Sequence, residues 1–158
     1  MSDSGAWLET VEIYSWAGMH QEAIVCYDHA IEINPSDGVA WFRKGFEFFL
    51  LDRNREALEC FNKALEINPK NVAALEIKGA YLLRCSKEQE AMECFDKAIQ
   101  IFDENACLWF NRGMVFKKRG NYWEALTSFE RGLEICPTDE DALRCVADIL
   151  KRIVRRRE

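Results

Sequence analysis

Cysteine and histidine are the side chains of this sequence with the chemistry to bind a metal ion or to act as a nucleophile and a base. The 158 residues include seven cysteines and two histidines. The cysteine count is odd and no Cys-x-x-Cys pair occurs, so neither a closed set of disulfides nor a common zinc spacing is indicated. We therefore expect no metal site and no cofactor. Free thiols are typical of a reducing compartment such as the cytoplasm.

Three of the cysteines, Cys26, Cys60 and Cys94, recur at one constant interval. On successive stacked helices, whose axes lie about 8 to 10 Å apart, they would be too far apart for the Cα separation that a disulfide tolerates. We expect them to be small buried apolar side chains. Cys107 and Cys145 are the one pair that could lie on neighbouring helices.

The sequence offers no convincing catalytic group. We find no nucleophile with a base, no paired carboxylates in a cleft and no phosphate-binding loop. His20 falls in a predicted turn and His29 on a predicted helix. Glu59 and Lys63 are four residues apart on a solvated helix face, where such a pair contributes a few tenths of a kcal/mol. We predict that the protein is not an enzyme.

One phrase, EALECFNKALEINP at residues 56–69, recurs three more times at the same interval as the cysteines. The other copies are EAIVCYDHAIEINP from Glu22, EAMECFDKAIQIFD from Glu90 and EALTSFERGLEICP from Glu124. Within the phrase, Ala57, Phe61 and Ala64 fall on one face of a helix. Two small residues around one ring indicate that another helix approaches this face closely.

A second helix is indicated upstream of each copy. Trp41, Gly45 and Phe48 have the same spacing, so this helix offers a glycine notch between two rings to the alanines of the first. Turn residues separate the two helices, and an Asn-Pro or Cys-Pro pair ends the second helix in three of the copies. The pattern predicts a helical hairpin with helices at about 38–51 and 54–67.

The repeated hairpin resembles the tetratricopeptide repeat family in its period and in its pattern, which fixes an aromatic or Leu, a Gly, an Ala, an aromatic residue and a Pro. These sites hold Trp7, Trp41, Leu75 and Trp109; Gly45, Gly79 and Gly113; Ala23, Ala57, Ala91 and Ala125; and Tyr27, Phe61, Phe95 and Phe129. Departures at Val11, Asp103 and Gly132 leave the register intact. The resemblance implies an all-α, right-handed superhelical solenoid of antiparallel helix pairs. It implies one domain over 1–158, with repeats at 4–37, 38–71, 72–105 and 106–139.

Residues 140–154 continue the apolar pattern as a predicted capping helix. Its apolar residues form one helical stripe with charged residues between them: Ala142, Leu143, Val146, Ile149, Leu150 and Ile153. A cap is expected because each repeat buries its face only against a neighbour, so the last repeat needs a cover with a polar outer side. The terminal KRIVRRR places cations near a helix C-terminus, where they interact favourably with the negative end of the helix dipole.

The charge balance argues against a general nucleic-acid binder, because the formal net charge is -6 and the pI is about 5.1. The exception is a basic cluster of Lys151, Arg152 and Arg155 to Arg157. This cluster leaves open an accessory role at nucleic acid or an anionic membrane. The longest apolar run, Phe48 to Leu51, is too short to span a bilayer, so we expect a cytoplasmic protein.

The resemblance further implies that the first helices of the repeats line a concave groove that binds a peptide or helix of a partner protein. One subgroup of the family clamps the carboxylates of an acidic chaperone tail with Lys, Asn and Arg. Its sites fall here on Leu8, Glu12, Arg43, Ala73 and Ile77, or one repeat later on Phe42, Phe46, Ile77, Cys107 and Asn111. Neither set supplies the several charge-assisted hydrogen bonds that a clamp needs, so a chaperone tail is not the expected ligand.

The groove sites implied by the family pattern are instead mostly apolar and end at a basic edge. They are Leu8, Trp16, Val39, Phe42, Arg43, Phe46, Phe49, Leu50, Ile77, Ala80, Leu83, Phe110, Asn111, Met114 and Lys117. We predict a scaffold or adaptor whose groove holds an amphipathic helix or an extended apolar segment, with aromatic and methionine anchors and orienting rim charges.

Two alternatives to an open groove remain at this stage. Some of the rings could bury against adjacent helices and face no ligand. The strip could also be covered by another copy of the chain, as a symmetric dimer or through an exchanged terminal helix. Similarly, Lys44, Lys78 and Arg112 could form a binding ladder, although long cationic side chains often lie along apolar surface.

Overall fold

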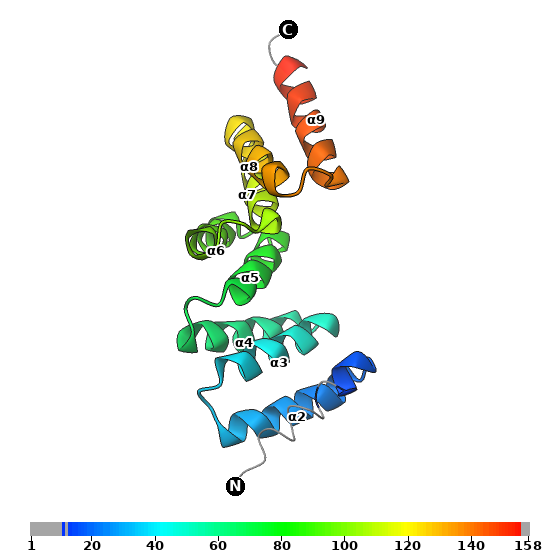
Figure 1. Ribbon diagram of the computed structural model, residues 1–158, viewed down its shortest axis with the longest axis vertical. Coiled ribbons are helices and arrows are strands. Elements are labelled where there is room, and N and C mark those ends of the chain that lie inside the picture. The colour runs from blue at the N-terminus through cyan, green and yellow to red at the C-terminus, as the bar shows by residue number, and fades with distance from the viewer. Residues whose placement is uncertain (1–10, 12, 156–158) are drawn as a thin grey trace. The chain divides into compact units, whose positions relative to one another are not determined.

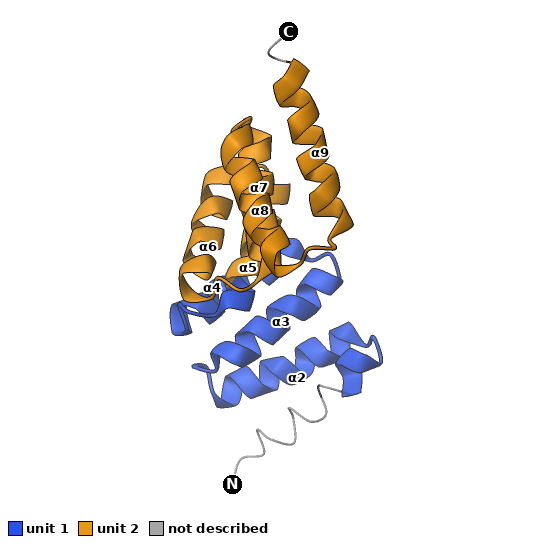
Figure 2. Cartoon of the chain, turned by 45° about the horizontal axis from the view of Figure 1, so that its top comes forward, with its two compact units in different colours: residues 1–74 blue, residues 75–158 orange. Residues whose placement is uncertain are grey.

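The computed structural model describes residue 11 and residues 13–155, and this part of the chain is helical (Figure 1). The helices are α2 (His20–Ile33), α3 (Gly38–Leu50), α4 (Asn54–Ile67), α5 (Val72–Arg84), α6 (Glu88–Ile101), α7 (Ala106–Arg119), α8 (Tyr122–Ile135) and α9 (Glu140–Arg155). The chain divides into two compact units, residues 1–74 and residues 75–158, coloured separately in Figure 2. Each unit is described by itself.

The helices α3, α5, α7 and α9 each start at an Asn or Asp that recurs with the repeat period. Asp37 accepts hydrogen bonds from the backbone N–H groups of Val39 and Ala40, at 2.9 and 3.0 Å. The same role falls to residues 71, 105 and 139, whose side-chain oxygens accept from Ala74, Cys107 and Ala142, respectively. These side chains satisfy backbone donors that have no partner within the helix.

The turn between the two helices of a hairpin is also periodic. Gly18, Asp52, Ser86 and Gly120 all have positive φ, at 72°, 59°, 59° and 79°. Glycine adopts this left-handed backbone without steric cost, whereas Asp52 and Ser86 adopt it with a side chain. The turn geometry is therefore kept in repeats where the sequence does not supply glycine.

The glycines of the first helices receive an aromatic ring from the second. A Cβ added to Gly45, Gly79 or Gly113 would lie 2.8, 2.7 or 3.1 Å from a ring carbon of Phe61, Phe95 or Phe129, respectively. The sequence indicated that alanines fill these notches. The ring fills them instead, because a phenyl group occupies the space of the missing side chain. The three rings are fully buried, and close packing of this kind leaves no room for a methyl group.

The three periodic cysteines are buried, as predicted. Burial raises the pKa of Cys26 and Cys94, and it raises the pKa of Cys60 to about 11. A neutral thiol behaves as a small apolar side chain, which suits a helix face packed against another helix.

The outer side of α9 is not the polar surface that the sequence predicted for a capping helix. Ala142 and Ile149 are buried in a cluster with Ala125, Leu126 and Phe129 of α8. Leu143 and Leu150 are each 47% exposed. The apolar arc of α9 is wider than the surface that the preceding hairpin can cover, so the outer side of this helix is partly apolar.

Candidate binding pockets

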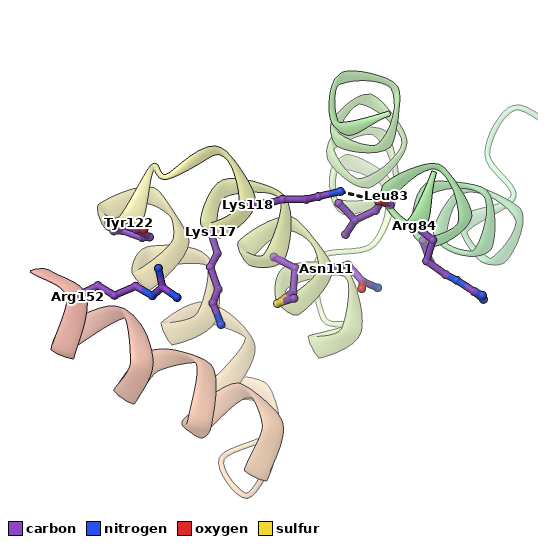
Figure 3. A pocket seen from close by; sticks show the side chains of 9 residues that line it. Leu83, Arg84, Asn111, Lys117, Lys118, Tyr122 and Arg152 are labelled. Carbon is purple, nitrogen blue, oxygen red and sulfur yellow. Dashed lines mark hydrogen bonds between the residues drawn. The ribbon is translucent and has the colours of Figure 1, made fainter. Parts of the chain in front are cut away.

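The unit of residues 75–158 holds a cavity of about 610 Å³ (Figure 3). Its lining combines apolar and cationic side chains: Ala80, Leu83, Arg84, Asn111, Met114, Lys117, Lys118, Tyr122 and Arg152. A cavity of this volume is in the range of those that hold small ligands or a few side chains of a peptide.

Four helices supply this lining. On α5, Ala80 and Leu83 are three residues apart, and on α7 Asn111, Met114 and Lys117 repeat the same spacing. Residues three or four apart share one face of a helix, so each helix turns one face toward the cavity. The start of α8 and the body of α9 contribute Tyr122 and Arg152 (Figure 3).

Lys118 is engaged within the unit. Its Nζ donates to the Ser86 Oγ at 2.9 Å and to the Leu83 carbonyl oxygen at 3.3 Å, and it pairs with Glu88 at 3.0 Å. The side-chain hydrogen bond from Lys118 is the largest of the influences that lower the pKa of Glu88. Lys118 therefore holds α7 to the end of α5 and the start of α6.

The other three cations that line the cavity differ from Lys118 in their ion pairing. Within the described residues, Arg84, Lys117 and Arg152 form no ion pair with a carboxylate. The Lys117 Nζ lies 3.4 Å from the Cys145 Sγ, which is a weak acceptor. Figure 3 shows Lys117 and Arg152 on facing helices, while Arg84 extends away from them. Two cations thus face each other across one side of an apolar cavity.

A smaller cavity of about 210 Å³ adjoins the first and shares Asn111 and Met114 with it. Its other lining residues are Cys107, Phe110, Phe129, Asp139, Asp141, Ala142 and Cys145. Cys107 and Cys145 line the same cavity as free thiols. The Cys145 Sγ lies 3.8 Å from the Met114 Sδ, so two soft sulfur atoms meet at the smaller cavity.

The unit of residues 1–74 has a pocket of about 390 Å³, lined by Ser15, Tyr27, Val39, Phe42, Arg43, Phe46 and Glu47. Glu47 is only 2% exposed. Its carboxylate accepts a hydrogen bond from the Ser15 Oγ and lies against the His20 Nδ1, both at 2.7 Å. The buried Glu47 carboxylate therefore joins Ser15 to His20.

The pockets collect many of the groove residues predicted from the sequence. Val39, Phe42, Arg43 and Phe46 line the pocket of residues 1–74, and Ala80, Leu83, Asn111, Met114 and Lys117 line the larger cavity of residues 75–158. Phe110 and Met114 line the smaller cavity. The groove as a binding surface stays a prediction, because cavity lining does not identify a ligand.

The remaining groove residues lie outside these pockets. Leu8 is outside the described residues, and Trp16, Phe49, Leu50 and Ile77 do not line the pockets above. The Phe49 ring stacks on Phe46 with centroids 6.4 Å apart. Trp16 is 92% exposed.

Two of the three cations that could have formed a ladder are used within the fold. Lys44 pairs with Asp28 and its Nζ lies over the rings of Trp41 and Phe48. Arg112 donates to Asp96 at 2.8 Å and to Ser128 at 3.1 Å, and its guanidinium lies over the rings of Trp109 and Phe116. Both side chains join neighbouring helices through ion pairs and cation–π contacts.

Sequence reasoning missed Arg84, Tyr122 and Arg152 as lining residues. The sequence does carry a signal for the two arginines, because Arg84, Lys118 and Arg152 are spaced by one repeat period and so occupy the same register on α5, α7 and α9. A capping helix only covers the last repeat, so that prediction places no groove residue on α9.

Models of the tetratricopeptide repeat match residues 6–37, 38–71 and 106–139. The chain belongs to the tetratricopeptide repeat family. These matches cover more than half of the sequence, and the fold class predicted from the sequence is confirmed: an all-α protein built from the helix pairs of this family. Tetratricopeptide repeat proteins are modules of protein–protein interaction.

Several solved tetratricopeptide repeat structures are similar to this chain. MamA 41-end from Desulfovibrio magneticus RS-1 has a TM-score of 0.89 at 16% identity, over 96% of this chain and 86% of that one. YrrB, described as a tetratricopeptide repeat protein with an unusual peptide-binding site, has a TM-score of 0.84 at 22% identity, over 98% of this chain and 79% of that one. PilF of Pseudomonas aeruginosa has a TM-score of 0.84 at 23% identity, over 96% of this chain and 69% of that one. A search of curated proteins finds no match.

In the described part of the chain, no group of three or more His, Cys, Asp or Glu side chains is arranged to hold a metal ion. No helix of residues 13–155 combines the length and apolar character needed to cross a bilayer.

Proposed function

We propose that this protein is a non-catalytic scaffold or adaptor that binds a segment of a partner protein in the 610 Å³ cavity of residues 75–158. Apolar side chains of the segment contact Ala80, Leu83 and Met114. A carboxylate beside them meets Lys117 and Arg152. The observation that carries the proposal is the pair of cations without a carboxylate partner, on an apolar cavity, in the part of the chain that is described.

Charge complementarity favours this ligand. The protein has a formal net charge of -6, and many of its other cations pair with a carboxylate. Lys117 and Arg152 instead face a cavity where a bound carboxylate would be partly shielded from water. Charge-assisted hydrogen bonds in such a place orient a ligand, while the apolar contacts supply most of the affinity. This arrangement differs from the chaperone-tail clamp, whose sites hold Phe42, Phe46 and Cys107 here.

The test uses three synthetic 12-residue peptides and fluorescence anisotropy. One combines Leu and Glu, one has Ser in place of every Leu, and one has Lys in place of every Glu. We expect only the Leu/Glu peptide to bind. Met114→Glu should weaken it by ten-fold or more, because this change puts a carboxylate into the apolar contact. Lys97→Glu on α6 is the control for charge, since Lys97 is exposed and does not line the cavity.

Salt dependence separates this function from its alternatives. Lys117→Ala should weaken Leu/Glu peptide binding several-fold and reduce its dependence on salt. If the basic C-terminus served nucleic acid or an anionic membrane, a DNA oligonucleotide or anionic vesicles would bind with a steep loss as salt rises. If a second copy filled the cavity, sedimentation would show a dimer that Met114→Glu dissociates. Equal binding of all three peptides would contradict the proposal.

A further inference from the structure

The pocket of about 390 Å³ in residues 1–74 contains a buried carboxylate at a position that holds no charged residue in the other repeats. We call it the Glu47 pocket. Glu47 is 2% exposed. Elsewhere in the chain the same register holds Ile13, Tyr81, Val115 and Ile149. A carboxylate loses most of its hydration on burial, whereas an apolar side chain gains stability there. Packing alone would therefore favour an apolar residue at position 47.

The partners of this carboxylate do not include a permanent cation. Its Oε1 accepts a hydrogen bond from the Ser15 Oγ and its Oε2 lies against the His20 Nδ1, both at 2.7 Å. Ser15 is neutral, and His20 carries a positive charge only when it is protonated. Among the described residues, no Lys or Arg forms an ion pair with Glu47. The pocket thus contains a buried negative charge whose oxygen atoms both have a partner already.

Aromatic rings form much of the remaining wall of the Glu47 pocket. Tyr27, Phe42 and Phe46 line it together with Val39. The Phe42 ring packs against Phe61, with ring centroids 5.9 Å apart, and this contact holds it in place. The face of an aromatic ring is the negative part of its quadrupole and attracts cations. The rings and the carboxylate therefore favour a ligand of the same charge.

The charge of the surrounding unit adds to this preference. Residues 1–74 contain six Lys or Arg and twelve Asp or Glu, so the whole formal net charge of -6 belongs to this unit. An acidic unit attracts cations and disfavours the approach of anions. Arg43 also lines the pocket, but it is exposed and has an interaction within the chain. Water and salt screen an exposed guanidinium more than they screen a buried carboxylate.

The hydrogen-bonding capacity of the pocket indicates which kind of cation fits. A primary ammonium brings three N–H donors, which need acceptors when its water is removed. The rings and Val39 supply no strong acceptor, and both oxygen atoms of Glu47 are engaged by Ser15 and His20. A quaternary ammonium combines a positive charge with an apolar surface and has no N–H donor. It therefore suits a site that offers rings and a negative charge but few free acceptors.

We propose that the Glu47 pocket binds a quaternary ammonium group. The rings of Phe42 and Phe46 contact its methyl groups, and the Glu47 carboxylate is its counter-charge. Val39 is 57% exposed and Phe46 is 38% exposed, so the pocket opens to solvent and can receive the end of a long side chain. A trimethyllysine of a partner protein and a free molecule such as choline both present this group. The site shares no lining residue with the cavity of residues 75–158 and takes the opposite charge.

The probes are three synthetic peptides of Gly, Ser and Ala that differ at one central residue. This residue is trimethyllysine, lysine, or an uncharged analogue of trimethyllysine in which carbon replaces the nitrogen. Isothermal titration calorimetry measures binding to the full chain. We expect the trimethyllysine peptide to bind saturably. The other two should bind at least about ten-fold more weakly, because one has lost the charge and the other must give up its hydration.

Choline, titrated separately, identifies the source of the group. If choline binds at least as tightly as the trimethyllysine peptide, the natural ligand is a free quaternary ammonium compound. If choline binds at least ten-fold more weakly, the ligand is a side chain of a partner protein, because the rest of the peptide then contributes to binding. Both results support a site for a quaternary ammonium.

Matched variants locate the binding of the trimethyllysine peptide. Phe46→Leu removes a ring but keeps an apolar side chain, and it should weaken binding at least five-fold. The control is Phe102→Leu, at a 49% exposed ring outside the pocket, which should leave binding within two-fold. Glu47→Gln keeps the size of the side chain and removes its charge, so it should weaken binding at least ten-fold. Its control is Glu59→Gln, at an exposed position of α4 in the same unit.

Circular dichroism establishes which variants fold. If Glu47→Gln does not fold, Phe46→Leu still tests the site, because Phe46 is partly exposed. Met114→Glu, which disrupts the proposed cavity of residues 75–158, should leave the trimethyllysine peptide bound. Failure of one proposal therefore does not imply failure of the other.

Three outcomes would overturn the proposal. The wild-type chain could bind neither the trimethyllysine peptide nor choline. The trimethyllysine peptide and its uncharged analogue could bind equally well, which would make the pocket a purely apolar site. Finally, folded Glu47→Gln and Phe46→Leu variants could bind the trimethyllysine peptide as tightly as their controls, which would place the binding elsewhere on the chain.

Discussion

The helices α7 and α9 carry the same register of side chains in different surroundings. Gly113 of α7 lies under the ring of Phe129, whereas Ala147 of α9, at the equivalent position, is exposed. The local sequence therefore creates an apolar face suited to a neighbouring helix. This face stabilises the fold only where a neighbouring helix buries it. The energetic contribution of equivalent residues should differ accordingly.

The largest expected difference is in the free energy of unfolding, between a change to the ring that covers α7 and a change to an uncovered apolar residue of α9. Phe129→Ala removes a fully buried ring and should lower the free energy of unfolding by about 3 to 5 kcal/mol. Leu150→Ala, at a half-exposed position, should change it by less than about 1 kcal/mol. Urea denaturation of both variants, followed by circular dichroism, measures the difference. Similar losses in the two variants would mean that α9 is covered in solution.

The next difference concerns the small residues themselves. Gly113→Leu forces a side chain into the ring of Phe129 and should cost about 1 to 3 kcal/mol. Ala147→Leu extends an exposed apolar face and should leave the midpoint of urea denaturation nearly unchanged. Ala147→Leu would instead be destabilising if another element already lay against α9.

A smaller difference is expected for the cations of the two helices. Arg112→Met removes the hydrogen bonds to Asp96 and Ser128 and the contacts with two rings, so it should lower the free energy of unfolding by about 1 to 2 kcal/mol. Lys151→Met should have almost no effect, because Lys151 has no partner among the described residues. Thermal denaturation of the two variants makes the comparison. The interpretation fails if Lys151→Met is the more destabilising change.

The last test changes no residue and leaves stability untouched. Burial raises the pKa of Cys60 to about 11, so at pH 8 only about one thiol in a thousand is ionised, and the reactive thiolate is scarce. Cys85 is exposed. Iodoacetamide labelling read by peptide mass spectrometry should modify Cys85 first, and the Cys60 rate should rise as pH approaches 11. Early labelling of Cys60 at pH 8 would contradict its burial.

Much of the fold was accessible to sequence reasoning because the signals are local and repeated. The caps at residues 37, 71, 105 and 139 and the buried Cys26, Cys60 and Cys94 all follow the repeat period. The candidate site was accessible only in part. Met114 and Lys117 were among the predicted residues, but Arg152 was not, because α9 was predicted as a cover for the last repeat rather than as a further first helix that lines the groove.

The sequence by itself determined the helix pairs, because a small residue on one helix and a ring on the next recur at fixed spacing and can be buried only by packing the two together. Tertiary structure decided which cations and which apolar faces remain available. Arg112 pairs with Asp96 on another helix, whereas Lys117 lies against a thiol and pairs with no carboxylate of the described residues. Phe116 is partly buried, whereas Leu150 is half exposed. Ion pairing depends on distances between helices, and burial depends on the presence of a neighbour. Neither quantity is contained in the local pattern of a single helix.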